Sequence, residues 1–401
     1  MTASPTTGPL HGVRVLELGS FIAGPFAGQL LGDYGADVIK VESPGDGDPM
    51  RHWGVTRDGD SLWWPAIGRN KRSVTLDLRH ERARELVLGL AAECDVVLEN
   101  FRPGVLERWG LDYPALSSVN PRIVVVHISG FGQTGPLAGQ AGFGSVGEAM
   151  GGIRHTTGSP DRPPSRAGIS LGDALASVFG VVGTLSALLA ARERGTGQEV
   201  DVAIYEAVAA LMESTMADYE LGGVVRSRSG SVLPGVAPSN VYPTGDGAEV
   251  VVAANADGVF ARLCKAMDRP DLAEDQKYAR LADRAAHSDE INGIVAEWTS
   301  AHDAHELEAA CVRHDVPVAT AYTAADMFGD PHFTARADLV TVDDPVAGPV
   351  RQQAPYPRYV GEQVVAPSGA PRLGEHTDEV LGTLLGVEHT ELEILRTQGI
   401  V

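Results

Sequence analysis

Apolar and polar segments alternate along the first 130 residues of the chain in a way that predicts strands and helices in turn. Four segments are apolar along most of their length, as buried strands are, namely residues 13–18, 36–42, 95–98 and 123–129. Residues 24–34 and 81–92, which lie between them, carry small or apolar residues at helical spacing. Because the strands of a parallel sheet are covered on both faces and connected by helices, this alternation predicts an α/β domain with a parallel sheet.

The pattern changes in the second half of the chain. An apolar helix is predicted over residues 174–191, followed by a strand over 198–204 and a long helix from Tyr205 to about Leu221. Residues 222–244 are rich in Gly, Ser and Pro and have few periodic apolar positions, which predicts an irregular linker.

A smaller, mixed α/β domain is expected after this linker. Residues 249–254 form a predicted strand, and helices are expected near residues 258–267, 288–301 and 304–313. The tail from Pro355 onward mixes Pro and Gly with one amphipathic segment, 375–385. A chain of 401 residues is long enough for two such domains.

Composition narrows the classes of partner. The net charge of −21 argues against nucleic acid or an anionic membrane surface as a partner. The N-terminus has no signal-peptide pattern, and no apolar run reaches the ~18 residues of a membrane span, because Ser and Gly interrupt the helix over 174–191. The three cysteines, Cys94, Cys264 and Cys311, form no CxxC motif and no disulfide framework, so we expect a cytoplasmic protein.

One basic cluster stands out against this acidic background. It comprises Arg69, Asn70, Lys71 and Arg72, with Arg51 upstream and Arg102 and Arg108 downstream. An anionic ligand would need a local group of cations of this kind. A solvated loop explains the same run of charges equally well, and the residues alone leave both interpretations open.

The segment 168–173 leads directly into the apolar helix and places Asp173 at its start. A carboxylate there stays ionised, because the first turn of a helix offers unpaired N–H groups and positive dipole charge. The small neighbours Gly172, Ala174 and Ser177 leave room for a bulky group to approach. These features suit a nucleophilic aspartate that attacks an acyl group. The competing interpretation is that Asp173 only caps the helix.

Several catalytic motifs are absent from the sequence. The glycines of segment 19–28 lack the G-x-G-x-x-G spacing of a dinucleotide site and the Gly-Lys-Ser/Thr of a P-loop. No G-x-S-x-G or H-E-x-x-H motif occurs. His302 and His305 share a predicted helix face, and we interpret them as a solvated pair rather than metal ligands. The sequence therefore predicts no metal site.

Five segments in order carry a resemblance to a known family. They are Val15–Glu17 with Ala23–Pro25, Gly35–Glu42, Asn70–Ser73, Glu99–Gly104 and Gly172–Asp173. On these segments the chain resembles the class III CoA-transferases, the family of formyl-CoA transferase and carnitine CoA-transferase, which also contains α-methylacyl-CoA racemase.

The resemblance implies a fold and an assembly. The fold would be a large Rossmann-like parallel-sheet domain with a smaller α/β domain. The large CoA-binding domain would begin with residues 1–221, the linker and small domain would span 222–325, and residues 326–401 would return to the large domain. Two such chains would form an interlocked homodimer.

The resemblance also implies roles for particular residues. Asp173 corresponds to the family's catalytic aspartate, and coenzyme A or acyl-CoA would be a substrate rather than a tightly bound cofactor. The residues expected to contact CoA are Phe21, Ala23 and Gly24, then Asn70, Lys71 and Arg72 at the nucleotide end, and Asn100, Phe101 and Arg108 along its length. Those expected in the substrate pocket are Ile22, Phe143, Gly144 and, in the loop 229–235, Gly230. That loop lacks the consecutive glycines of formyl-CoA transferase.

The mechanism implied is CoA transfer through covalent intermediates on the aspartate. Asp173 would attack the thioester of the donor to give a mixed anhydride, and the released thiolate would return to form an aspartyl-CoA thioester. The acceptor carboxylate would attack that thioester and finally receive CoA. Each step passes through an oxyanion, which needs nearby N–H donors.

Two comparisons within the family bear on the reaction. The racemases carry a His where this chain has Phe143, and Phe cannot move a proton, so a racemase or epimerase is disfavoured unless His127 or His155 substitutes. Formyl-CoA transferase carries Tyr-Glu at Phe143-Gly144 and Gln at Ile22, which indicates a less polar pocket here. A non-catalytic CoA-binding protein is a further alternative.

The less polar pocket favours a larger acyl group or a branched dicarboxylate over oxalate. Segments 148–152 and 239–240 are similar to members that use succinyl-CoA with C4 to C6 dicarboxylic or hydroxy acids. A second carboxylate of the acceptor would be held by Arg154, His155 or Arg166, which otherwise are solvated loop residues.

Overall fold

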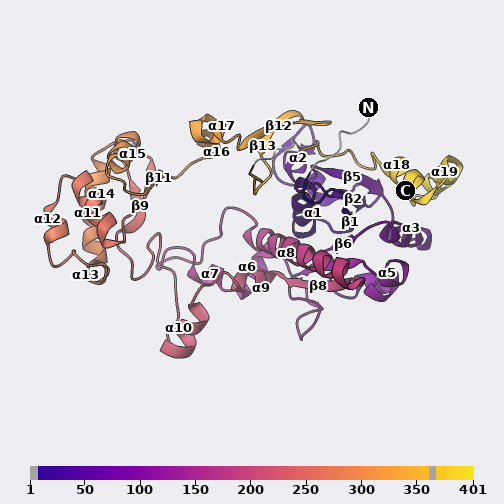
Figure 1. Cartoon of the computed structure of the whole chain (residues 1–401), viewed down its shortest axis with the longest axis horizontal. Coiled ribbons are helices and arrows are strands. Elements are labelled where there is room, and N and C mark those ends of the chain that lie inside the picture. The colour runs from indigo at the N-terminus through magenta and orange to yellow at the C-terminus, as the bar shows by residue number, and fades with distance from the viewer. Residues whose placement is uncertain (1–7, 361–366) are drawn as a thin grey trace. The chain divides into compact units, whose positions relative to one another are not determined.

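The computed structural model describes residues 8–360 and 367–401, which fold into two compact units (Figure 1). The first unit contains the chain up to Ile153, Ala167–Ala217 and Thr334–Val401, and the second contains Arg154–Arg166 and Asp218–Phe333. The chain thus leaves the first unit twice, whereas the sequence led us to expect one excursion over 222–325. The additional segment, 154–166, is tied to the later one because Gly230 donates its N–H to the carbonyl of Gly158 (3.0 Å).

A six-stranded parallel sheet forms the centre of the first unit. Its strands are β1 (Arg14–Glu17), β2 (Asp37–Glu42), β5 (Lys71–Thr75), β6 (Val96–Glu99), β7 (Val124–Ser129) and β8 (Gln198–Ala203). Their order is β5-β2-β1-β6-β7-β8, and every neighbouring pair is parallel. The sheet confirms the predicted α/β class. After β1 the chain adds β2 and β5 on one side of the sheet. It then returns to β6 on the other side of β1 and adds β7 and β8, so strand order reverses between β1 and β6.

Helices cover both faces of this sheet. On one face α1 (Ala23–Asp33) and α8 (Leu171–Arg194) pack on a core that includes Val15, Val96 and Val126. The other face carries α3 (Glu81–Ala92), α5 (Tyr113–Val119), α18 (Thr377–Leu385) and α19 (His389–Thr397). Burial on both faces explains why β1, β6 and β7 are largely apolar rather than alternating.

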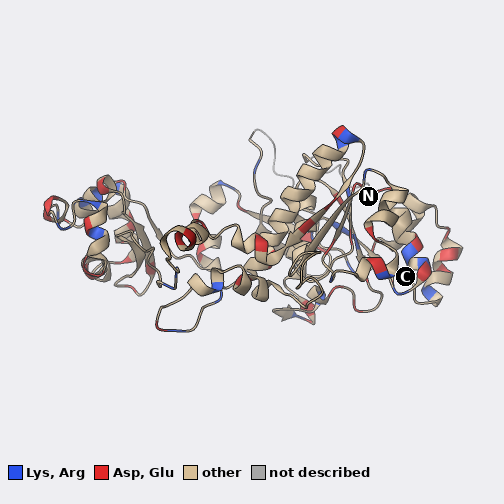
Figure 2. Ribbon diagram, turned by 90° about the horizontal axis from the view of Figure 1, so that it is seen from below, with Lys and Arg blue, Asp and Glu red and all other residues tan. Residues whose placement is uncertain are grey.

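The long helix α8 is buried along one side only. Residues Ala176, Gly180 and Ala187 face the core, whereas Phe179 and Val182 are exposed. No charged side chain lies between Asp173 and Arg192 on this helix (Figure 2). Its most apolar 18-residue window has a mean hydropathy of 2.0 and is 44% buried, so length and composition alone would also fit a membrane span. The prediction of a buried core helix therefore holds for one face.

The long helix predicted from Tyr205 to Leu221 is wrong in extent. The chain forms two helices, α9 (Ile204–Ala209) and α10 (Thr215–Gly222). Between them Glu213 adopts a left-handed backbone conformation with φ 50°, which an α-helix cannot accommodate.

The second unit is a smaller α/β body, as the sequence predicts. Its antiparallel sheet has the order β11 (Val318–Thr320), β10 (Glu249–Ala253) and β9 (Ser239–Pro243). The helices of this region are α11 (Asp257–Ala266), α12 (Asp271–Glu274), α13 (Leu281–Ala286), α14 (Ser288–Ser300), α15 (Ala304–Arg313) and α16 (Ala324–Gly329). Tyr242, Phe260 and Ile291 belong to its own core.

Shorter elements complete the described chain. They are η1 (Pro49–Arg51), β3 (Thr56–Arg57), β4 (Asp60–Ser61), α2 (Trp64–Ile67), α4 (Val105–Trp109), α6 (Gly144–Met150), α7 (Ile153–Thr156), α17 (Pro331–Ala335) and the hairpin of β12 (Leu339–Asp344) with β13 (Gly348–Gln353).

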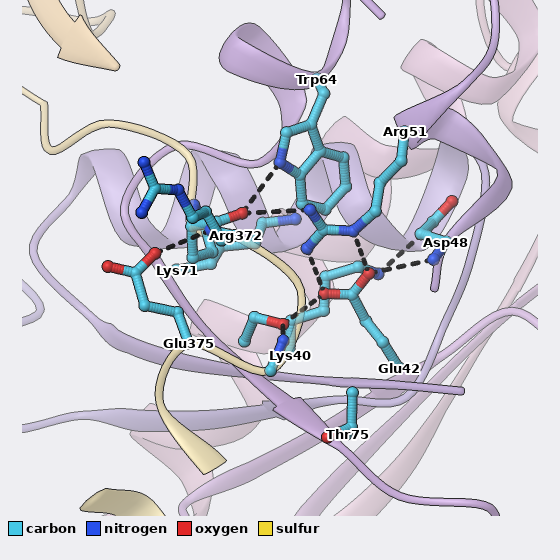
Figure 3. A network of polar contacts seen from close by, with 12 residues as sticks. Lys40, Glu42, Asp48, Arg51, Trp64, Lys71, Thr75, Arg372 and Glu375 are labelled. Carbon is cyan, nitrogen blue, oxygen red and sulfur yellow. Dashed lines mark hydrogen bonds and ion pairs between the residues drawn. The ribbon is translucent and has the colours of Figure 1, made fainter. Parts of the chain in front are cut away.

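A buried charge network joins β1, β2 and β5 (Figure 3). The Nζ atom of Lys40 lies 2.9 Å from Oε1 of Glu17 and 2.8 Å from Oδ2 of Asp48, and it donates to the carbonyl of Gly19 (2.9 Å). The Nζ atom of Lys71 lies 2.8 Å from Oε2 of Glu17. Both lysine side chains are fully buried, so their charges depend on these partners.

The two lysines differ in how firmly they keep their protons. Burial disfavours the charge on Lys40, but Glu17, Asp48 and Glu42 outweigh it and raise the pKa of Lys40. Burial dominates at Lys71 and, together with repulsion from Lys40, lowers the pKa of Lys71 to about 8 despite its contact with Glu17.

The network continues to Arg51. Its guanidinium binds both carboxylate oxygens of Glu42 (2.8 and 2.7 Å) and lies 3.9 Å from the ring centroid of Trp64. Three cations and the three carboxylates Glu17, Glu42 and Asp48 thus balance one another inside the unit.

We expect Lys40→Met to destabilise the protein by about 3–5 kcal/mol, because it leaves Glu17 and Asp48 buried with one cation fewer. The free energy of unfolding from urea denaturation measures this effect. Arg82→Ala is the control, since the Arg82–Glu391 pair is exposed and its loss should cost less than about 1 kcal/mol. Equal losses in the two variants would contradict the structural importance of the buried network.

Candidate functional site

The candidate site lies at the carboxyl ends of β1 and β6, where strand order reverses. Ligands of open α/β sheets bind in the crevice at such a point. Asn100, which follows β6, clamps Ser20 in the turn after β1: it donates to the Ser20 carbonyl (2.8 Å) and accepts the Ser20 N–H (2.8 Å). A Cβ on Gly19 would lie 2.5 Å from Oδ1 of Asn100, so only glycine fits beside this clamp.

Phe21 occupies an unusual backbone conformation in the same turn. Its φ of 64° lies in the left-handed region, and its N–H is held by Oδ1 of Asp48 (3.1 Å). Such a strained residue persists only where its surroundings enforce it. Here the charge network enforces it, because the other oxygen of Asp48 binds Lys40.

A row of half-exposed aromatic side chains runs past Phe21. The ring of Phe21 meets Trp53 edge to face with centroids 5.8 Å apart, and Trp53 stacks on Trp63 at 6.1 Å. On its other side Phe21 meets Phe143 edge to face at 6.4 Å. All four rings are between 37% and 63% exposed, so the row is an open apolar wall rather than core.

Asp173 lies at the end of this row that Phe143 occupies. It is the third residue of α8, and Ser170 occupies the N-cap position, so the interpretation of Asp173 as the cap residue is wrong. A Cβ on Gly144 would lie 2.1 Å from Oδ2 of Asp173, which places the carboxylate directly against the Gly144 backbone. The structure therefore brings Phe143, Gly144 and Asp173 together, as the sequence predicts.

Glu148 supports this arrangement, and sequence reasoning gave it no role there. Its side chain is buried and its Oε1 accepts the N–H of Gly172 (3.1 Å). A Cβ on Gly172 would lie 2.7 Å from the carbonyl oxygen of Gly144, so the two segments make their closest possible approach. The signal available in the sequence was a single carboxylate within the otherwise small and apolar segment 144–152.

Ser177 fastens α8 to the turn after β1. Its buried hydroxyl lies 2.7 Å from the carbonyl oxygens of both Ala23 and Asp173. Of the residues predicted to contact CoA, Ala23 and Gly24 begin α1 at this junction, and both are buried.

A pocket of about 280 Å³ opens beside the turn, at the carboxyl ends of the strands. Its lining comes from the ends of β1, β2 and β5 and from α4, and comprises Leu18–Ser20, Lys40–Ser43, Gly47–Pro49, Leu76–Arg79, Phe101 and Trp109. Phe101 meets Trp109 edge to face at 5.2 Å. The sequence analysis named Phe101 but missed Leu76 and Arg79, because β5 itself was not recognised.

The basic cluster is not a solvated loop, because β5 begins at Lys71. Asn70 donates to Asp33 (2.7 Å), Lys71 is buried on Glu17, and Arg72 binds Asp37 (2.6 Å). The charge of Lys71 is therefore met inside the protein, and only Asn70 and Arg72 keep partly exposed faces.

Exposed cations lie instead in the segment that follows β6. Arg102 and the predicted CoA contact Arg108 are exposed and make no ion pair within residues 8–360 and 367–401. Arg79, on the pocket rim, is held by Asp77 (2.6 Å).

Ile22 and Gly230 are the other two residues predicted for the substrate pocket. Ile22 is buried in a separate cluster with Met50, Trp64 and Ile67, because its apolar side chain points toward the loop that holds Arg51. Gly230 belongs to the second unit, where it adopts a left-handed conformation with φ 70°. In the part of the chain that the structure describes, no group of three or more His, Cys, Asp or Glu side chains forms a metal site.

Comparison with known proteins agrees with these features. A family model described as CoA-transferase family III matches residues 10–377. The chain is 49% identical over 394 residues to succinyl-CoA–D-citramalate CoA-transferase of Chloroflexus aurantiacus, covering 98% of each protein. It is 38% identical to succinyl-CoA:mesaconate CoA-transferase of Haloarcula marismortui, covering 93% of this chain and 96% of the relative. A crystal structure of a CaiB/BaiF family protein from Brucella suis superposes with a TM-score of 0.83 at 35% identity, covering 94% and 99%.

We expect Gly144→Ala to slow CoA transfer by about 100-fold, since the added methyl group must displace the Asp173 carboxylate. Steady-state kcat measures the effect. Gly139→Ala, in the loop that precedes α6 and with open space around it, is the matched control and should retain the wild-type rate. Similar rates for both variants would show that the position of Asp173 against Gly144 does not matter for turnover.

Proposed function

The chain belongs to CoA-transferase family III, and from this premise we propose that it transfers CoA from succinyl-CoA to a small carboxylic acid through covalent intermediates on Asp173. The observation that carries the proposal is the Asp173 carboxylate in the first turn of α8, packed against Gly144 at the end of an open aromatic wall. The names of the relatives support the donor, since both act on succinyl-CoA.

The setting of Asp173 suits a nucleophile. The positive end of the α8 dipole favours its ionised form, and the neighbouring glycines leave the carboxylate approachable from the side of Phe143. Glu148 accepts the N–H of Gly172 in the first turn, which helps to fix the helix end beside Asp173.

The proposed reaction conserves charge and protons. One oxygen of Asp173 bonds to the thioester carbonyl carbon, the C–S bond breaks, and the CoA thiolate leaves. The thiolate then attacks the Asp173 carbonyl and releases the donor as its carboxylate. An acceptor carboxylate attacks the resulting aspartyl-CoA thioester and displaces the thiolate, which finally bonds to the acceptor carbonyl and restores Asp173.

The aromatic wall bears on the acceptor. Phe21, Trp53, Trp63 and Phe143 offer an apolar surface beside the nucleophile, which fits an acid that carries an apolar branch better than oxalate. The names of two relatives contain citramalate and mesaconate. Each of these diacids has a four-carbon chain with one methyl branch, so it is a C5 acid. We therefore propose a branched C5 dicarboxylic or hydroxy acid as acceptor.

The placement of histidines weighs against the racemase alternative. His127 lies on β7 between Val126 and Ile128, which face the α8 side of the sheet. Its side chain therefore points to the opposite face, away from the helix that carries Asp173. Phe143, beside Asp173, has no proton to transfer.

The exposed face of α8 supports a homodimer. Val178, Phe179, Val182 and Leu189 are between 39% and 67% exposed, which is unusual for large apolar side chains grouped on one helix. We propose that a second copy of the chain covers this face, in an interlocked assembly. The three cysteines are free and buried, which fits the proposed cytoplasmic location.

We expect Asp173→Asn to lower CoA transfer by a factor on the order of 10³ or more, because the amide oxygen is a poor nucleophile. Purified protein with succinyl-CoA and a panel of dicarboxylic acids, read by mass spectrometry, measures the new acyl-CoA. Glu193→Gln, at the exposed end of the same helix, is the control and should transfer normally. Wild-type rates in Asp173→Asn would refute the covalent mechanism, and CoA binding without any transfer by wild type would favour a binding protein.

We expect Trp53→Ala to raise KM for a methyl-branched acceptor by about 10-fold more than for an unbranched one, because one buried methyl contact is worth this much. Paired kinetics with succinyl-CoA as donor and either citramalate or its unbranched counterpart malate as acceptor measure the ratio. Val55→Ala, exposed and outside the aromatic row, should leave the ratio unchanged. An unchanged ratio in Trp53→Ala would remove the aromatic wall from acceptor recognition.

A further inference from the structure

His127 is a buried titratable residue that the proposed reaction does not use. It lies in the first unit, on the face of the sheet opposite α8. Its Nδ1 is 2.6 Å from Oε1 of Glu99, the last residue of β6, and its Nε2 is 3.2 Å from Oε1 of Glu199 on β8. Glu99 is also buried, whereas the side chain of Glu199 is 52% exposed.

The positions of the two glutamates define the charge state of the ring. An ionised carboxylate only accepts hydrogen bonds, so an imidazole between two carboxylates satisfies both only when both of its nitrogens carry protons. Burial disfavours the cation, but the hydrogen bonds and charges of Glu99 and Glu199 outweigh it and raise the pKa of His127. The two carboxylate contacts thus favour the imidazolium form of His127 over the neutral ring.

Other titratable groups, on the neighbouring helices, interact with the carboxylates of Glu99 and Glu199. Glu107 on α4 lies close enough to Glu99 to favour its protonation, and Tyr113 on α5 feels the charge of Glu199. Burial raises the pKa of Glu99, and the hydrogen bond from His127 opposes that rise. The cation of His127 therefore favours the ionised form of Glu99 against the effect of burial.

Glu99 connects the His127–Glu99 pair to the pocket at the carboxyl ends of the strands, where CoA would bind. Its second oxygen, Oε2, accepts the N–H of Phe101 (2.6 Å), and Phe101 lines the pocket together with Trp109. The intervening residue, Asn100, clamps Ser20 in the turn after β1. One carboxylate thus fixes the corner that carries both the clamp and the pocket wall.

We propose that protonated His127 is a positioning residue for CoA binding, which holds Glu99 ionised and thereby fixes the corner formed by Glu99, Asn100 and Phe101. The identity of the ligand rests on the proposed function. When His127 loses its proton, one of its two carboxylate contacts is lost. The buried, ionised Glu99 then lacks its cation and shifts, and the N–H of Phe101 loses its aligned acceptor. Because the cation is present below its raised pKa and lost above it, CoA affinity is high at pH 6 and falls as pH rises through that value.

The first experiment measures the Kd of CoA by calorimetry between pH 6 and pH 9 for wild type and His127→Asn. The phosphates of CoA also titrate in this range, and the ratio of the two Kd values at each pH removes their contribution. We expect His127→Asn to bind about 10-fold more weakly at pH 6 and the two proteins to converge at pH 9. A ratio that is constant across the range would overturn the proposal.

The second variant, Glu199→Gln, separates charge from structure. It removes the exposed partner and leaves the buried Glu99 contact, so it should move the pH at which CoA affinity falls to a lower value without weakening binding at pH 6. A purely structural role of His127 predicts no such displacement. An unchanged pH profile in Glu199→Gln therefore counts against the proposal, even if His127→Asn fails to fold.

The Phe101 amide provides a readout that does not depend on CoA. Its hydrogen exchange in the free protein, corrected for the intrinsic rate, should accelerate above the pKa of His127 in wild type. If wild type binds no CoA at any pH, the proposed function fails, and this exchange profile still tests the coupling between His127 and the corner. Exchange that is independent of the His127 charge would overturn the coupling itself.

Discussion

The buried ammonium group of Lys40 is the constraint on which the first unit depends. It joins Glu17 and the Gly19 carbonyl, at the end of β1, to Asp48 in the loop after β2. A charge in a low-dielectric interior must be paired. Few arrangements of these segments other than the observed one would leave every charge paired. Because Asp48 also holds the N–H of Phe21, the ion pair determines where the aromatic wall begins.

Three glycines are as important for the geometry of the site as the side chains that it contains. Gly19 leaves room for the Asn100 clamp, Gly144 for the Asp173 carboxylate, and Gly172 for the carbonyl of Gly144. Each of these contacts brings backbone to within a distance that a Cβ would occupy. The Asp173 carboxylate is therefore positioned by rigid main chain on one side and by the body of α8 on the other, which limits its motion, as the proposed attack from one direction would require.

The sequence predicted those elements whose burial is uniform. β1, β2, β6 and β7 were evident from their apolar runs, and the strand predicted over residues 198–204 is β8, so the sequence indicated five of the six parallel strands. β5 was missed because Lys71 and Arg72 look solvated, and nothing local shows that Glu17 and Asp37 will meet them across the sheet. The break near Glu213 likewise follows from a backbone conformation that helical spacing does not reveal. Asp173, by contrast, was recognisable because its helix start and small neighbours are contiguous in sequence.

The internal use of cations changes how an acidic chain can bind a polyanion. Lys71 and Arg72 look available in the sequence, yet each is ion-paired within the fold, with Glu17 and Asp37 respectively. Attraction for the CoA phosphates would then come from the exposed Arg102 and Arg108, which surround the corner that Asn100 and Phe101 form. The same corner carries the pocket wall and the clamp on the turn after β1. Recognition of the nucleotide and placement of the reacting end would therefore depend on one short segment, whose geometry is in turn fixed by the buried carboxylate of Glu99.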